Sequence, residues 1–147
     1  MSYQAVHEKL ASQKTVILDG AIGTEILRRQ LSWADHRLAD HPDAIRSIHE
    51  DYIRVGADVI STNSFQLCRR AFYNHFRDAA HRRQIGARDL DDRPNQLLAA
   101  SVRLAQEARQ RAAAGRPVAV AAAVTTLEWC FRPDLAPSVD QARQEYR

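Results

Sequence analysis

Three short apolar runs recur along the chain, at residues 15–18, 57–62 and 118–124. They are rich in β-branched residues or alanine, and turn-forming residues follow the first two. Runs of this length and composition are typical of strands that other elements cover on both faces. The pattern therefore predicts three buried strands of a parallel sheet.

Two longer segments between these runs have helical spacing. Each begins at a proline, Pro42 or Pro94, and each ends at a glycine, Gly56 or Gly115, as helices commonly do. The expected inner face of the first is Ile45, Ile48, Tyr52 and Val55. That of the second is Leu97, Leu98, Val102, Ala105 and Ala108. His49 lies beside the first stripe, and we expect it to pack in the core.

The predicted elements alternate as strand, helix, strand, helix, strand. A short helical piece is expected at 25–30, a helix followed by a loop at 66–93, and a last helix capped by Ser138. Alternation of this kind is typical of right-handed crossovers that join parallel strands. We therefore expect an α/β fold with about three parallel strands.

Composition and charge narrow the choice of function. The 147 residues fit one domain, 45% of them are apolar, and no run approaches the length of a membrane span. The N-terminus has no apolar segment of the secretory kind, so we expect a cytoplasmic protein without a membrane partner. The net charge is +3, but the basic residues are interleaved with aspartates and no aromatic platform accompanies them. A nucleic-acid partner is therefore not expected.

A compact loop, DGAIGT at residues 19–24, follows the first predicted strand. A nucleotide-binding loop is one interpretation, but the GxGxxG spacing and the Walker lysine are missing. Gly20 and Gly23 permit a tight turn. The Asp19 carboxylate could bond to N–H groups of its own turn or face a ligand, and both can hold at once.

Three segments carry motifs in a fixed order. They are ILDGAIGTE at 17–25; HPDAI, His49 and YIRVGADVISTNSF within 41–65; and TLEWCFRPDL at 126–135. They are similar to LDGAMGTE, to P-E-x-V…H-x-x-Y-x-x-A-G-A-D-I-I-x-T-N-T-F and to P-L-E-D-C-Y-x-P-E-L. In this order and spacing, they resemble the N-terminal portion of the homocysteine S-methyltransferase (homocysteine-binding domain) family.

The resemblance implies the N-terminal part of a (β/α)8 TIM barrel, with the active site at the carboxyl ends of the strands. Three strands cannot close a barrel that needs eight. Residues 1–147 are therefore expected to form a partial homocysteine-binding domain whose third strand has an unpaired apolar edge. Self-association or a complementary chain would cover that edge.

The family transfers a methyl group from a small donor to the thiol of homocysteine, which gives methionine. Zinc bound by thiolates keeps that thiol deprotonated. By resemblance, Asp19 and Gly20 hold the amino-acid end of homocysteine, and Thr62 adds a hydroxyl or backbone contact. Glu128, in a strand-end loop, can touch the substrate. No residue of this chain is expected to be catalytic.

The zinc ligands of the family are a cysteine after a later strand and a Cys-Cys pair in a Gly-Gly-Cys-Cys-Gly context. Nothing in this sequence corresponds to them, and Cys68 and Cys130 stand elsewhere, as reduced thiols. Two interpretations stay open. One is the N-terminal part of a methyltransferase, inactive alone and with an undetermined methyl donor. The other is a non-catalytic remnant or half-barrel that binds an amino acid or a complementary chain.

Overall fold

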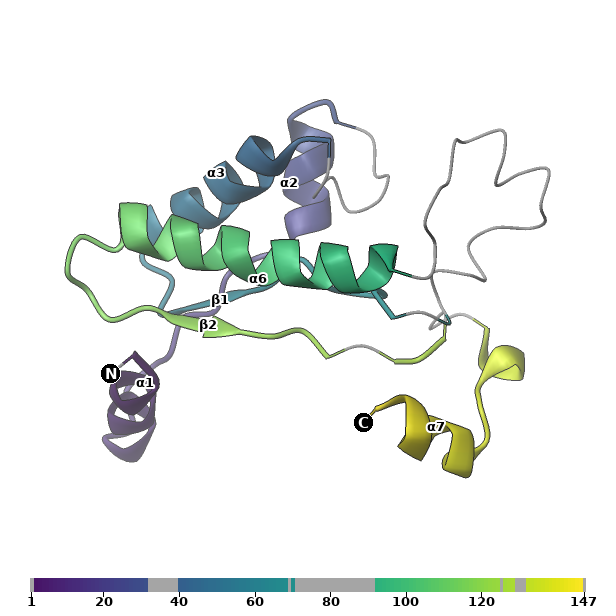
Figure 1. Ribbon diagram of the computed structural model, residues 1–147. Helices are drawn as coiled ribbons and strands as arrows, with labels where there is room; N and C mark the ends of the chain where they lie inside the picture. The colour runs from purple at the N-terminus through teal and green to yellow at the C-terminus, as the bar shows by residue number, and fades with distance from the viewer. Residues whose placement is uncertain are drawn as a thin grey trace. The chain divides into compact units, whose positions relative to one another are not determined.

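The structure is a computed structural model that describes residues 2–31, 40–68, 70, 92–124, 126–128 and 132–146. Its elements, in chain order, are α1 (Ser2–Ala11), α2 (Ile22–Arg28), α3 (Pro42–Arg54), β1 (Val59–Ser61), α6 (Arg93–Ala112), β2 (Ala119–Ala121), the 3-10 turn η2 (Pro133–Leu135) and α7 (Val139–Glu145) (Figure 1). They fall into two compact units, Met1–Asn63 with Ala99–Ala123, and Ser64–Leu98 with Val124–Arg147. None of the described helices is long and apolar enough to cross a membrane.

The sheet of the first unit consists of β1 and β2, which are parallel. Val59 lies opposite Ala119, Ile60 opposite Val120 and Ser61 opposite Ala121. A parallel pair with α6 between its strands in sequence confirms the predicted α/β alternation. The sheet is open, and both strands are shorter than their apolar runs.

The first predicted strand, at residues 15–18, is not a buried strand, so that prediction is wrong. This segment makes only an isolated bridge, between Leu18 and Val59. Ile17 and Leu18 are 50% and 65% exposed, because nothing in the described part of the chain covers their side chains. The segment keeps its direction beside β1 through backbone bonds, for example from Asp19 N–H to the Val59 carbonyl at 3.0 Å.

The core of the first unit lies between the sheet and the helices α3 and α6. Its buried members are Ile53, Ala57, Ile60, Ala105, Ala108, Val118 and Val120. In the view of Figure 1, α3 and α6 lie above the two strands and α1 lies below them. The alanines of α6 and β2 are small, which lets the helix approach the sheet closely.

The ends of α3 and α6 follow the predicted signals. Pro42 opens α3, and Gly56 and Gly115 have positive φ angles of 113° and 81° after the two helices. The inner faces differ in part from the prediction. Val55 is exposed because α3 ends at Arg54. On α6 the buried positions are Pro94, Leu97, Ser101, Leu104, Ala105 and Ala108. Val102 lies at the rim of that stripe and is exposed, so its placement in the core was wrong.

The remaining helices can also be compared with the prediction from the sequence. The α7 helix begins as predicted at Ser138, whose hydroxyl oxygen accepts the Gln141 N–H at 3.3 Å in a capping box. The α1 helix was not predicted, because its sequence has no clear apolar stripe. The helix expected within 66–93 falls almost entirely outside the described residues.

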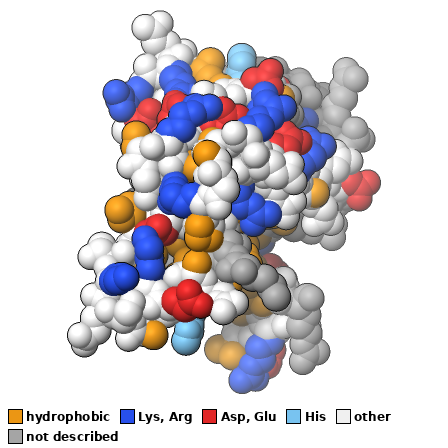
Figure 2. All heavy atoms as spheres, turned by 90° about the vertical axis from the view of Figure 1, so that its left-hand side faces the viewer, with side chains coloured by type: hydrophobic (Ala, Val, Ile, Leu, Met, Phe, Trp, Pro, Cys, Tyr) orange, Lys and Arg blue, Asp and Glu red, His pale blue; other side chains and the backbone are white. Residues whose placement is uncertain are grey.

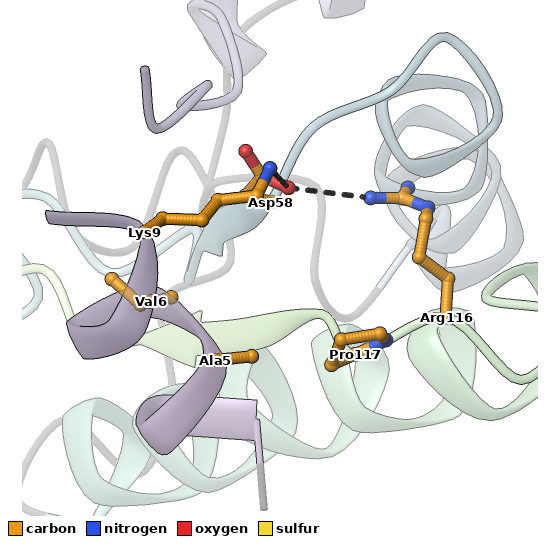
Figure 3. A pocket seen from close by; sticks show the side chains of 6 residues that line it. All are labelled: Ala5, Val6, Lys9, Asp58, Arg116 and Pro117. Atoms are coloured by element: carbon orange, nitrogen blue, oxygen red, sulfur yellow. Dashed lines mark hydrogen bonds and ion pairs between the residues drawn. The ribbon is translucent and has the colours of Figure 1, made fainter. Parts of the chain in front are cut away.

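Asp58, at the amino end of β1, joins α1 to the sheet. Its carboxylate accepts the Lys9 ammonium at 2.6 Å and the Ile17 N–H at 3.0 Å, and Arg116 lies 3.7 Å away (Figure 3). Burial pushes the pKa of Asp58 up, but these bonds and charges outweigh it and hold the pKa below its usual value. Beside the cluster is a pocket of about 190 Å³.

Arg116 also binds backbone carbonyl oxygens at the carboxyl end of α3. Its guanidinium donates to the carbonyl oxygens of Ile53 at 2.6 Å and Ala57 at 2.9 Å. Carbonyls at the end of a helix lack partners within the helix, so a cation there stabilises it. Charged side chains therefore hold α1, α3 and the sheet together at the amino end of the strands, on a face where Lys, Arg, Asp and Glu side chains lie interspersed (Figure 2).

Candidate functional site

Asp19 and Ser61 form the centre of the candidate site, at the carboxyl end of the strands. The Asp19 carboxylate accepts the Ser61 N–H at 2.7 Å and the Ser61 hydroxyl at 3.0 Å. Burial raises the pKa of Asp19, and the bonds from Ser61 offset this only in part. The carboxylate is thus fixed on β1, partly buried, and it lacks a neighbouring cation among its described contacts. A ligand ammonium would supply one.

Gly20 lies against the ring of Tyr52, which comes from α3. A Cβ atom at position 20 would lie 2.6 Å from the Tyr52 hydroxyl oxygen and 3.0 Å from two ring carbons. Real Cβ atoms do not approach other atoms so closely, so only glycine fits without a shift. The loop is therefore clamped from two sides, by Ser61 through Asp19 and by Tyr52 through Gly20.

The helix α2 continues this loop and is tied to α3. Arg29, directly after α2, donates to the Asp51 carboxylate at 2.6 Å and to the Ala44 carbonyl at 3.1 Å.

Burial, with the negative charges of Glu25 and Asp19, raises the pKa of Tyr52. The phenol therefore stays protonated beside two carboxylates.

Thr62 lies next to Ser61 and is buried. Its N–H donates to the Ala121 carbonyl at 2.9 Å, and its hydroxyl oxygen accepts the Ala123 N–H at 3.1 Å. Both bonds hold the carboxyl ends of β1 and β2 together. Asp19, Gly20 and Thr62 thus share one end of the first unit, which is where their places after strands put them.

Glu128 belongs to the second unit, where it is buried. The Thr126 hydroxyl donates to the Glu128 carbonyl at 2.8 Å, and the Cys68 thiol donates to the Leu127 carbonyl at 3.3 Å. These local bonds hold the loop in which Glu128 lies. Its contact with substrate stays a prediction.

Comparisons with known proteins identify the fold that presents this site. Residues 16–147 match the profile of a family described as Homocysteine S-methyltransferase. The chain belongs to the homocysteine S-methyltransferase family. It is 34% identical over 131 residues to Homocysteine S-methyltransferase 4 of Zea mays, covering 80% of this chain and 35% of the relative. It is 33% identical over 116 residues to Homocysteine S-methyltransferase of Escherichia coli (strain K12), covering 75% and 33%.

A solved structure agrees with this membership. The metallated form of the homocysteine methyltransferase MmuM from Escherichia coli matches with a TM-score of 0.59 and 30% identity, over 79% of this chain and 40% of that one. The chain spans about a third of the length of the curated homocysteine S-methyltransferases that it matches. Its candidate site is therefore compared with only the first part of theirs.

A metal ion would need a donor set that the described residues do not form. In the described ranges, no group of three or more His, Cys, Asp or Glu is placed to hold one. Cys68 faces backbone carbonyls, and Cys130 lies outside the described residues. Within these ranges, the residues do not fit the zinc site that the resemblance implies.

His49 is buried in α3, which confirms that it packs in the core. Neither ring nitrogen has a hydrogen-bond partner within the described parts of the chain. Burial lowers the pKa of His49 to about 4, so the ring is neutral at physiological pH. The histidine of the family motif is therefore a neutral ring packed in the core.

Sequence reasoning missed Ser61 and Tyr52 as members of the site. Ser61 stood inside an apolar strand run, and Tyr52 was assigned to the inner face of a helix. Tyr52 does pack against the core, but its hydroxyl reaches Gly20. The available signal was positional, since a polar residue at a strand end often faces the loop of the neighbouring strand.

Proposed function

We propose that this chain is the homocysteine-recognition part of a homocysteine S-methyltransferase. It would hold the amino-acid end of homocysteine while a methyl group passes from a small donor to the thiol, which gives methionine. The chain would form the N-terminal part of a (β/α)8 barrel and a partial homocysteine-binding domain. Family membership and the fixed Asp19 carboxylate support this. The cytoplasmic location and the lack of a nucleic-acid partner stay predictions from composition.

The arrangement around Asp19 is the observation that carries the proposal. Ser61 orients the carboxylate, and burial makes its charge costly in the absence of a cation. An ammonium group placed against it would make charge-assisted hydrogen bonds, which are stronger than neutral ones. Homocysteine carries such a group at the end opposite its thiol, so binding there leaves the sulfur pointing away from Asp19.

Gly20 and Thr62 complete the proposed contact. Gly20 has no side chain, and Tyr52 fills the space that a side chain would take, so the proposed contact of Gly20 with homocysteine is made by its backbone. Thr62, one residue beyond Ser61, is proposed to add a hydroxyl or backbone contact at the same end, where its N–H and hydroxyl also bond to Ala121 and Ala123. Glu128 is proposed as a further substrate contact on the family resemblance alone. All four residues position the substrate, and none acts on the sulfur.

The proposal can be tested by titrating L-homocysteine into the ¹⁵N-labelled chain and following backbone amides by NMR. We expect shifts at Asp19, Gly20, Ser61, Thr62 and Glu128. Asp19→Asn should weaken binding about tenfold or more, because it removes the charge that faces the ammonium. Asp140→Asn, on exposed α7, is the matched control and should change nothing. Equal affinity of Asp19→Asn and the unchanged chain would contradict the proposal.

A second candidate is a binding half that does no chemistry. The observation that bears on it is that, within the described ranges, no group of three or more His, Cys, Asp or Glu is placed to hold a metal ion. Such a chain would bind an amino acid or a complementary chain. Both candidates involve the same amino-acid site, and methionine formation, assayed with the complementary part of a barrel present, separates them.

A further inference from the structure

Ser61 holds the Asp19 carboxylate by two hydrogen bonds of different origin. Its backbone N–H donates to Oδ2 of Asp19 at 2.7 Å, and its hydroxyl donates to Oδ1 at 3.0 Å. Any residue except proline would supply the first bond, because that bond comes from the backbone. The second needs a short side chain with a hydroxyl donor, as serine and threonine have. The hydroxyl bond is therefore a property of the residue at position 61 rather than of the strand.

The place of Ser61 on β1 keeps this geometry fixed. Ser61 lies opposite Ala121 of β2 in the parallel register, and the N–H of the next residue, Thr62, donates to the Ala121 carbonyl at 2.9 Å. At the other edge of β1, the Asp19 N–H donates to the Val59 carbonyl at 3.0 Å. Backbone bonds thus hold both residues in place, so replacing the hydroxyl changes the contact to the carboxylate and leaves the strand paired.

Both bonds from Ser61 favour the ionised form of Asp19. An ionised carboxylate only accepts hydrogen bonds, whereas a protonated one carries an O–H that needs an acceptor. Burial has the opposite effect and is the larger of the two, so the pKa of Asp19 lies above its usual value. The ionisation of Asp19 therefore depends on the opposed effects of burial and of the two donors of Ser61.

We propose that Ser61 is a positioning residue for homocysteine binding, and that its hydroxyl keeps Asp19 ionised and oriented at the acidic end of the pH range in which homocysteine binds. The inference rests on the proposed function, in which Asp19 receives the ammonium group of the ligand. A carboxyl group that has taken up a proton loses the charge that attracts an ammonium. Binding is therefore lost as the pH falls through the pKa of Asp19, and removal of the hydroxyl moves this acid limit to higher pH.

Two helices bring other titratable or charged groups towards the Asp19 loop. They are Tyr52 on α3, and Glu25, Arg28 and Arg29 on or directly after α2. Tyr52 stays protonated in acid because its pKa is raised, and arginines stay charged throughout this range. The neighbouring strand β2 consists of alanine and valine. Glu25 is common to all the variants below, so a difference in acid limit between them reports on Asp19.

The first measurement needs no ligand and follows the ¹³Cγ NMR signal of Asp19 from pH 7 to pH 4. Ser61→Ala should raise the titration midpoint of Asp19 by about one pH unit, the size expected for one hydrogen bond to a charged group. Ser61→Thr keeps a hydroxyl and should restore the midpoint. Ser12→Ala, which removes a hydroxyl bond within α1, is the matched control and should change nothing. Circular dichroism at each pH checks that every variant is folded.

The second measurement is isothermal titration calorimetry with L-homocysteine over the same pH range. The affinity should fall in acid, and in Ser61→Ala the fall should begin about one pH unit higher, with rescue by Ser61→Thr. An Asp19 midpoint or an acid limit that is the same in Ser61→Ala and the unchanged chain overturns the inference, while homocysteine binding stands. Failure of the unchanged chain to bind homocysteine at any pH overturns the proposed function, and this inference with it.

Discussion

At the scale of single residues, Asp19 and Gly20 show how much a short motif can predict. Their place after the apolar run at 15–18 put them correctly beside the carboxyl end of β1, together with Thr62. The partners that hold them, Ser61 and Tyr52, come from other elements. A contact between segments about 30 to 40 residues apart leaves no periodic signal in one sequence, so pattern analysis could not find it.

Gly20→Ala tests the clamp on this loop. The added methyl group meets the Tyr52 ring at 2.6 to 3.0 Å, so we expect a loss of about 1–3 kcal/mol in the free energy of unfolding. The measurement is urea denaturation followed by circular dichroism. In a Tyr52→Ala background the ring is gone, and Gly20→Ala should then cost about 1 kcal/mol less. The same loss in both backgrounds would mean that Tyr52 does not confine position 20.

The buried His49 should make the free energy of unfolding depend on pH. Burial lowers its pKa in the folded state to about 4, whereas the unfolded chain has the ordinary value near 6.5. As pH falls below that value, the unfolded state gains a proton that the folded state does not. The stability present above pH 6.5 is therefore lost towards pH 4, by about 3 kcal/mol in total.

Urea denaturation at several pH values between 7 and 4 measures this effect. His49→Leu should remove this part of the slope and should not weaken the chain at pH 7, because it replaces two buried nitrogens that lack partners. His7→Gln, on the exposed side of α1, is the control. Asp19, whose pKa is raised, contributes with the opposite sign, and it is common to all three proteins. An equal slope in His49→Leu would show that this ring is not the source.

At the scale of elements, the ends of the helices were easier to predict from the sequence than their buried faces. Proline and glycine marked the ends of α3 and α6, and Ser138 marked the start of α7. Val102 and Val55 were predicted to be buried but are exposed. Which side of a helix is buried depends on where the neighbouring elements lie. The run at 15–18 was assigned a buried strand from composition alone, yet burial needs an element on each side. The α1 helix was missed because charge and a single tyrosine, rather than an apolar face, attach it.

The Asp58 cluster should account for much of that attachment. Asp58→Asn removes the charge shared by Lys9 and Arg116, and we expect a loss of about 1–3 kcal/mol. Lys9→Met should cost less, at most about 1 kcal/mol, since the ammonium is partly exposed. Guanidinium denaturation measures both, with Arg143→Met on exposed α7 as the control. If Asp58→Asn is as stable as the unchanged chain, the cluster does not hold α1 and the sheet together.

At the scale of the whole molecule, three motifs in register predicted the family, and the family match from residue 16 onward bears this out. The alternation of strands and helices predicted the parallel α/β arrangement as well. The chain spans about a third of the length of its relatives, so it can show only part of a barrel. The fixed carboxylate at Asp19 is the part of the proposed homocysteine site that this chain contains.

Isothermal titration calorimetry with two ligands tests that account most directly. L-Homocysteine and 4-mercaptobutyrate differ only in the ammonium group that Asp19 is proposed to receive. We predict that the unchanged chain binds homocysteine about tenfold or more tightly than the analogue, and that Asp19→Asn binds the two alike. Equal affinities for both ligands in the unchanged chain would contradict the claim that Asp19 recognises the amino group of homocysteine.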